Sequence, residues 1–191
     1  ILRKIIKLHP AQELYVSSVN AKTYNRELIF TIVGSEFFRK GGLEVLSAFD
    51  KLIQEKYPIK LNIISLLKIT QDDLFIGESD KKSALATINR YPGSINYYPF
   101  LPNNKVIEIF KNSHIGLLPS HRETYGYSAL EAMACGIPVV STKKGAFGID
   151  AQHQREVLIA DSPAKFANHV VSLFRNKDLH LKLSQNARRL V

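Results

Sequence analysis

Cysteine is almost missing from this sequence: Cys135 is the only one among 191 residues. A single cysteine excludes a disulfide within the chain. Its neighbours, Ala134 and Gly136, are small, which favours a buried thiol over a nucleophile. The scarcity of cysteine also favours a reducing compartment, and we therefore expect a cytoplasmic protein.

Long apolar runs are missing as well, although 45% of the residues are hydrophobic. This combination is typical of a soluble globular protein and argues against a membrane-spanning helix. A chain of this length has room for one sizeable core. No segment resembles a signal peptide, and the sequence starts at Ile1 instead of methionine, which suggests a fragment of a longer protein.

Acidic residues are scarce relative to basic ones: 17 Asp and Glu stand against 26 Lys and Arg, a formal charge of +9. The excess favours an anionic partner, which is a nucleotide, a nucleic acid or an acidic lipid surface. The basic residues are scattered along the chain, so a solvated surface accounts for most of them. Charge alone does not separate the three partners.

Strand-like and helix-like segments alternate from residue 28 onward. Short apolar, β-branched runs predict strands, and apolar residues at helical spacing predict helices. This order predicts an α/β fold with a doubly wound, Rossmann-like parallel sheet and helices on both faces. Residues 1–27 have weak periodicity and are expected to form a connector or the remnant of an interdomain segment. The expected strands are 28–33, 61–67, 95–100, 115–118, 138–141 and 157–160, and the expected helices are 43–57, 81–90, 104–111, 127–135, 164–174 and 179–190.

Two glycine-containing segments, 34–41 and 120–126, each follow an expected strand. Ligands of such sheets bind beyond the C-terminal ends of the strands, so we expect both segments on one rim. The second segment leads into a helix start, where free N–H groups and the positive end of the helix dipole suit a phosphate.

Two glutamates, Glu123 and Glu131, stand eight residues apart around that helix start. Glu131 is either a solvated helix residue or, one turn inside the helix, an acceptor for the two hydroxyls of a ribose. Glu123 either faces a sugar or caps the free N–H groups of the helix. Gly126 either admits a phosphate at close range or is merely a helix-entry glycine. The pattern favours a site for a ligand that carries both phosphate and sugar.

Three segments resemble the retaining glycosyltransferases of GT-B architecture known as group 1 or family 4. The run from Ser120 to Ser141 resembles their E-x7-E signature, because Glu123 is followed by LEAMACGIPVV at 130–140. Residues 30–46 (FTIVGSEFFRKGGLEVL) resemble the first strand, glycine turn and Lys-Gly helix start. Residues 160–166 (ADSPAKF) resemble a late strand-to-helix junction. The resemblance covers residues 28–191 and implies the C-terminal, nucleotide-sugar-binding half of a GT-B enzyme.

The resemblance also implies roles for individual residues. Glu131 would bind the ribose, Glu123 would face the donor sugar, and Lys40 with Arg39 would balance the charge of the departing diphosphate. The backbone N–H groups at the helix start would bind the diphosphate itself; they belong to Gly126, Tyr127, Ser128 and Ala129. Glu123 and Lys40 are therefore the predicted catalytic residues.

An Asp-x-Asp metal signature is missing, since Asp72 and Asp73 are adjacent and are expected to lie in a surface turn. We therefore expect neither a metal nor a cofactor. The family usually has an arginine where this chain has Ser35, and Arg39 is the candidate substitute. His121, Arg122, Lys143 and Lys144 are weaker candidates at the same rim, whereas Tyr125 and Tyr127 are expected to be packing residues.

The implied reaction moves a sugar from a nucleoside diphosphate, most often UDP, to an acceptor hydroxyl with retention at the anomeric carbon. Relatives carry an N-terminal domain that binds the acceptor, so this chain alone is expected to turn over little or nothing. The commonest setting is bacterial surface polysaccharide or lipopolysaccharide assembly, which implies a saccharide or lipid-linked acceptor and peripheral association with the inner membrane. Two alternatives stay open, a GT-B nucleotide-sugar epimerase and a basic nucleic-acid-binding module. The second is disfavoured because the aromatic residues fall mostly inside strands and helix stripes.

Overall fold

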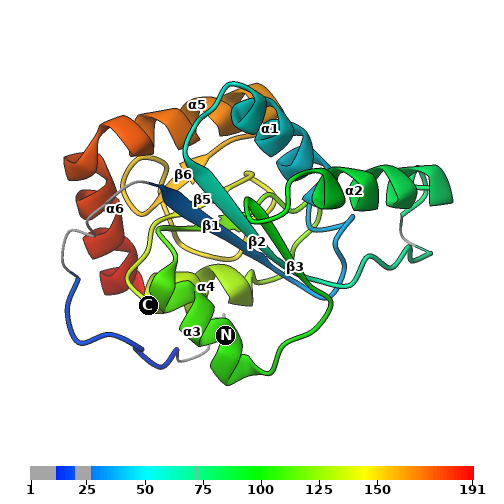
Figure 1. Cartoon of the computed structure of the whole chain (residues 1–191). Helices are drawn as coiled ribbons and strands as arrows, with labels where there is room; N and C mark the ends of the chain where they lie inside the picture. Colours follow the sequence, from blue (N-terminus) through cyan, green and yellow to red (C-terminus); the bar gives the residue numbers. More distant parts are fainter. Residues whose placement is uncertain (1–11, 20–26, 72) are drawn as a thin grey trace, which may run out of the picture.

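A computed structural model describes residues 12–19, 27–71 and 73–191. Six strands and six helices follow one another in these parts of the chain (Figure 1). Most of the expected connector at 1–27 lies outside the described residues, so that prediction stays untested. Within it, residues 12–19 pack against the body of the domain, where the Tyr15 N–H donates to the Ala134 carbonyl (3.1 Å) and Arg188 donates to the Val16 carbonyl (2.9 Å).

All six strands are parallel and pair in the order β3-β2-β1-β4-β5-β6. The predicted α/β, doubly wound sheet is therefore confirmed. The strands are β1 (Leu28–Val33), β2 (Ile59–Ile64), β3 (Ile95–Tyr98), β4 (Ile115–Leu118), β5 (Val139–Ser141) and β6 (Val157–Ile159). The helices are α1 (Gly42–Gln54), α2 (Glu78–Arg90), α3 (Asn103–Asn112), α4 (Tyr127–Ala134), α5 (Pro163–Arg175) and α6 (Lys177–Leu190).

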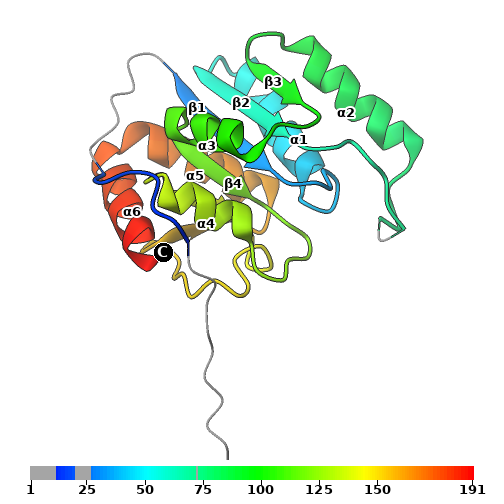
Figure 2. The same cartoon turned by 90° about the horizontal axis from the view of Figure 1, so that it is seen from below.

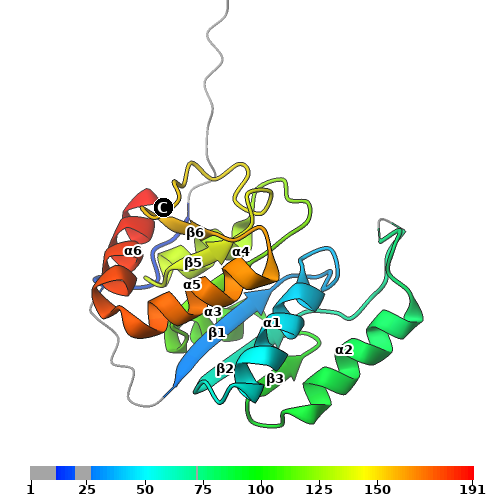
Figure 3. The same ribbon diagram turned by 90° about the horizontal axis from the view of Figure 1, so that it is seen from above.

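The helices form a layer on each face of the sheet. Helices α1, α2 and α5 cover one face (Figure 3), and α3 and α4 lie on the other (Figure 2). Helix α6 closes one side, because Leu183 belongs to the core under α1 and α5 while Ala187 belongs to the core under α3 and α4. Among the described residues, no helix combines the length and the apolar character that crossing a membrane requires.

Two small differences from the sequence-based expectation have clear causes. The third strand ends at Tyr98 and leaves Phe100 77% exposed, because Pro99 has no N–H with which to continue the ladder. The second strand spans 59–64 instead of 61–67, since Ile59 already pairs with Leu28. Cys135 is buried, as predicted.

Candidate functional site

The two segments expected on one rim do lie side by side at the C-terminal edge of the sheet. Strands β1 and β4 are neighbours, with Ile32 opposite Leu117, so the loops that follow them leave the sheet together. Gly41 makes the close approach possible: its φ is +75°, and a Cβ atom there would stand 2.2 Å from the Pro119 carbonyl oxygen. Two hydrogen bonds join the loops, from the His121 N–H to the Arg39 carbonyl (3.0 Å) and from the Arg39 guanidinium to the Arg122 carbonyl (2.8 Å).

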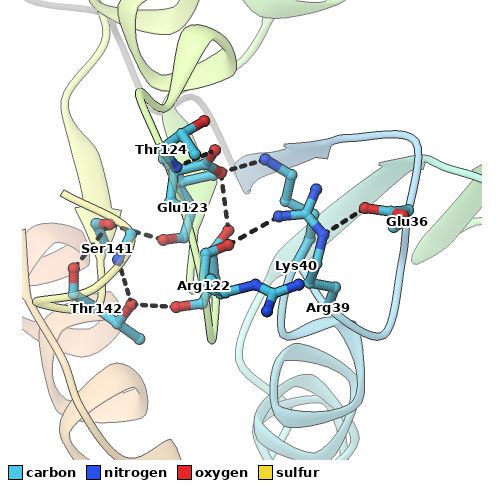
Figure 4. A network of polar contacts seen from close by, with 11 residues as sticks. Glu36, Arg39, Lys40, Arg122, Glu123, Thr124, Ser141 and Thr142 are labelled. Atoms are coloured by element: carbon cyan, nitrogen blue, oxygen red, sulfur yellow. Dashed lines mark hydrogen bonds and ion pairs between the residues drawn. The ribbon is translucent and has the colours of Figure 1, made fainter. Parts of the chain in front are cut away.

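Lys40 and Glu123 form an ion pair at the centre of this rim (Figure 4). Their side chains are only 11% and 8% exposed. Glu123 also accepts hydrogen bonds from the Ser120 hydroxyl (3.3 Å) and the Thr124 N–H (3.1 Å). Burial opposes ionisation of Glu123, but its bonds to Lys40 and to backbone N–H groups outweigh burial, so its pKa lies below the ordinary value.

The backbone contacts of Glu123 bear on the choice between a capping and a sugar-facing role. The carboxylate binds N–H groups of Thr124 and Gly126, which lie in the turn before α4. Glu123 therefore stabilises the turn that precedes α4. Its contact with a sugar stays a prediction.

The start of α4 has the features of an anion site. Its N-cap residue, Gly126, has a φ of +54° and offers no side chain to the first N–H groups. The hydroxyl of Ser128 is enclosed and has no hydrogen-bond partner among the described residues. Such a group costs stability until it finds a partner. Tyr127, expected to be a packing residue, is instead 59% exposed, whereas Ala129 and Leu130 of the same turn are buried in the core.

Glu131 lies in the second turn of α4 and is half-buried. Burial raises the pKa of its carboxyl group, and the described residues supply no ion-pair partner for it. The structure thus brings Arg39, Lys40 and Glu123 together, places the segment from Gly126 to Ala129 directly after them, and sets Glu131 one turn farther along. The functional roles of these residues remain predictions.

The flanking candidates have partners that the sequence did not indicate. His121 pairs with Glu44 of α1, at 3.0 Å between Nε2 and Oε1, and Asp161 accepts the Lys143 N–H at 2.8 Å. Arg39 pairs with Glu36, so its substitution for the arginine missing at Ser35 stays a prediction. The sequence did not point to Glu44, because Glu44 and His121 are far apart in the sequence and no motif spacing connects them.

Several known proteins resemble this chain in sequence. The model of the family described as glycosyl transferases group 1 matches residues 18–190. The D-inositol 3-phosphate glycosyltransferase of Segniliparus rotundus is 25% identical over 156 residues, which are 77% of this chain and 32% of that protein. The N-acetyl-alpha-D-glucosaminyl L-malate synthase of Bacillus anthracis is 30% identical over 90 residues, which are 46% of this chain and 24% of that protein. The chain therefore spans about a quarter to a third of the length of these two relatives.

Solved structures share the fold. The C-terminal domain of a group 1 glycosyl transferase, LpcC, from Francisella tularensis has a TM-score of 0.71 and 23% identity, and covers 86% of this chain and 84% of that one. HepE of Anabaena in complex with UDP-glucose has a TM-score of 0.70 and 16% identity, and covers 86% of this chain but 43% of that one.

Proposed function

The chain belongs to the group 1 glycosyl transferases, and we propose that it is the donor-binding half of an enzyme that transfers a sugar from a UDP-sugar to an acceptor hydroxyl with retention. The observation that carries the proposal is the Lys40–Glu123 pair beside the uncapped start of α4. A cation, free N–H groups and a carboxylate then converge where a nucleoside diphosphate sugar would lie. UDP is proposed as the nucleotide because HepE, of similar fold, is described in complex with UDP-glucose.

Lys40 would act on the bond that breaks. Negative charge grows on the diphosphate as the sugar leaves, and a fixed cation in a partly buried site stabilises that charge. The N–H groups of Tyr127 and Ser128 would add donors that are already oriented. Each tenfold in rate requires about 1.4 kcal/mol, and we propose that Lys40 and the helix start supply such stabilisation without a metal.

Glu123 would hold the donor sugar and Glu131 the ribose. Lys40 reduces the cost of keeping Glu123 ionised, which leaves its carboxylate an acceptor of hydrogen bonds from sugar hydroxyls. Glu131 has no competing ion pair among the described residues, so two ribose hydroxyls would satisfy it.

The remaining features of the enzyme are proposals that rest on relatives spanning a longer chain. We propose that an acceptor-binding domain completes the site, that this chain alone binds UDP weakly and turns over little, and that the whole enzyme works in the cytoplasm. A saccharide or lipid-linked acceptor in surface polysaccharide or lipopolysaccharide assembly fits the family.

Calorimetric titration of the chain with UDP, GDP and ADP tests the donor assignment. Glu131→Gln should weaken UDP binding about tenfold, because a neutral amide accepts ribose hydroxyls less well than a carboxylate does. Glu78→Gln, an exposed change in the first turn of α2, is the matched control and should leave binding within twofold. Equal affinity of the Glu131 variant and the wild type would contradict the proposed site.

A further inference from the structure

A cavity of about 490 Å³ lies beside the rim, on the face of the sheet that α1 and α5 cover. Its walls come from the start of α1, the start of α5 and the loops after β4 and β5. This volume lies in the range of sites that hold small ligands.

The cavity is distinct from the proposed donor site but shares a wall with it. Its lining includes neither Lys40 nor Glu123, and α4 lies on the opposite face of the sheet. Ser120 lines the cavity, and its hydroxyl also donates to Glu123 (3.3 Å). A ligand that contacts Ser120 in the cavity would therefore be connected to the Glu123 carboxylate, which is assigned to the donor sugar, through one hydrogen bond.

The charges around the cavity favour an anion. Lys143 and Lys144 line it, are exposed and have no ion-pair partner among the described residues. Of the two acidic groups in the lining, Glu44 pairs with His121, whereas Asp161 accepts the Lys143 N–H and keeps its negative charge, which is fewer than the two charges of the lysines. The two lysines thus remain to face a ligand that carries negative charge.

The same cavity also offers contacts for a sugar ring. Oε2 of Glu44 is enclosed and has no hydrogen-bond partner among the described residues, so it is free to accept a hydroxyl. Val45, Ala160 and Phe166 supply an apolar floor. An apolar floor with a few convergent polar groups is the usual composition of a small-ligand site.

We propose that this cavity binds a phosphorylated saccharide: the phosphate faces Lys143 and Lys144, and a ring hydroxyl donates to Glu44. Its assignment to the acceptor rests on the proposed function, because the shared Ser120 wall would bring an acceptor next to the donor sugar. The donor-binding half would then contribute to the choice of acceptor.

Titration of the 15N-labelled chain with glucose 6-phosphate, followed by amide chemical shifts, tests the proposal. Glucose and inorganic phosphate are separate arms, which distinguish a phosphorylated sugar from its two parts. The test variant is the double substitution Lys143→Gln with Lys144→Gln. The matched control is Lys81→Gln with Lys82→Gln, which removes the same charge from α2.

Saturable shifts at residues 142–144 and 160–163 are expected with glucose 6-phosphate, and weaker ones with either part alone. The test variant should bind about fivefold more weakly, and the control within twofold of the wild type. Shifts confined to residues 126–131, equal losses in both variants, or inorganic phosphate binding as tightly as the sugar phosphate would each overturn the proposal. UDP is titrated into the same variants: its failure to bind the wild type would refute the proposed function, while the cavity shifts still decide this inference.

Discussion

Separating Lys40 from Glu123 is the sharpest perturbation that the structure offers. Both side chains are about nine-tenths buried, so removing one partner leaves the other charge unpaired in a poorly solvated place. Loss of one member of a fully buried pair typically costs 3–5 kcal/mol. Glu123 keeps its bonds to Ser120 and Thr124, so for Lys40→Met we expect the lower value of about 2–3 kcal/mol.

Thermal unfolding of the two single variants and the double variant measures this coupling. For a chain of this size about 1 kcal/mol corresponds to 2–4 °C in Tm, so Lys40→Met should lower Tm by about 5–10 °C. The double variant Lys40→Met with Glu123→Gln should be less destabilised than the sum, by about 1–3 kcal/mol. The exposed Lys51–Glu55 pair is the matched control, with a coupling below about 0.5 kcal/mol.

UDP binding by the same variants separates the two roles. Lys40→Met should weaken UDP about tenfold, since a charge-assisted bond to phosphate is lost. Glu123→Gln should bind UDP as tightly as the wild type or more tightly, because Lys40 is no longer shared with a carboxylate. Strictly additive stabilities, or an equal loss of UDP affinity in both variants, would refute the reasoning.

Three further predictions concern neighbouring groups. 2′-Deoxy-UDP should bind the wild type several-fold more weakly than UDP but Glu131→Gln nearly equally, as competition titrations would show; an unchanged ratio would remove Glu131 from the ribose. Gly41→Ala should lower Tm by several degrees, because the added methyl group meets the Pro119 carbonyl and the residue needs φ +75°; an unchanged Tm would mean that the two loops are not packed as described. The hydrogen bond to Glu44 raises the pKa of His121 above 6.5, and the bond to His121 outweighs burial to lower the pKa of Glu44 below 4.5. The pair therefore stabilises the fold most between those values, and loses its effect as pH rises through the His121 pKa or falls through the Glu44 pKa. His121→Gln should be destabilised by less than about 1 kcal/mol in that window, since both groups are partly exposed, and should match the wild type at pH 9; a difference that persists at pH 9 would refute the ion pair.

The fold was predictable because its signals are local. Leu28–Val33 is a mostly apolar run bounded by Gly34, and Gly126 directly precedes the apolar residues of α4. Each element can therefore be recognised from a few consecutive residues. The meeting of residues 34–41 with 120–126 also followed, since strand ends in a parallel sheet share one edge. The Lys40–Glu123 contact itself did not follow, because side-chain pairing across 83 positions depends on packing at Gly41 that no pattern encodes.

The position of the proposed site is a consequence of the strand order. The chain builds β1, β2 and β3 outward in one direction and then returns to place β4 on the other side of β1. Helix α1 therefore leaves β1 toward one face, whereas α4 leaves β4 toward the opposite face (Figure 1). The two loops meet at this point, which is where doubly wound sheets bind their ligands.

The loop after β4 consequently has two functional sides. Glu123 is positioned toward Lys40 and the start of α4, whereas His121, two residues earlier, pairs with Glu44 and lines the cavity beside α1. Ser120 lines the cavity and donates its hydroxyl to Glu123. A shift of this loop caused by a ligand in the cavity would thus act directly on the carboxylate proposed to hold the donor sugar, which couples the two sites through a single turn of backbone.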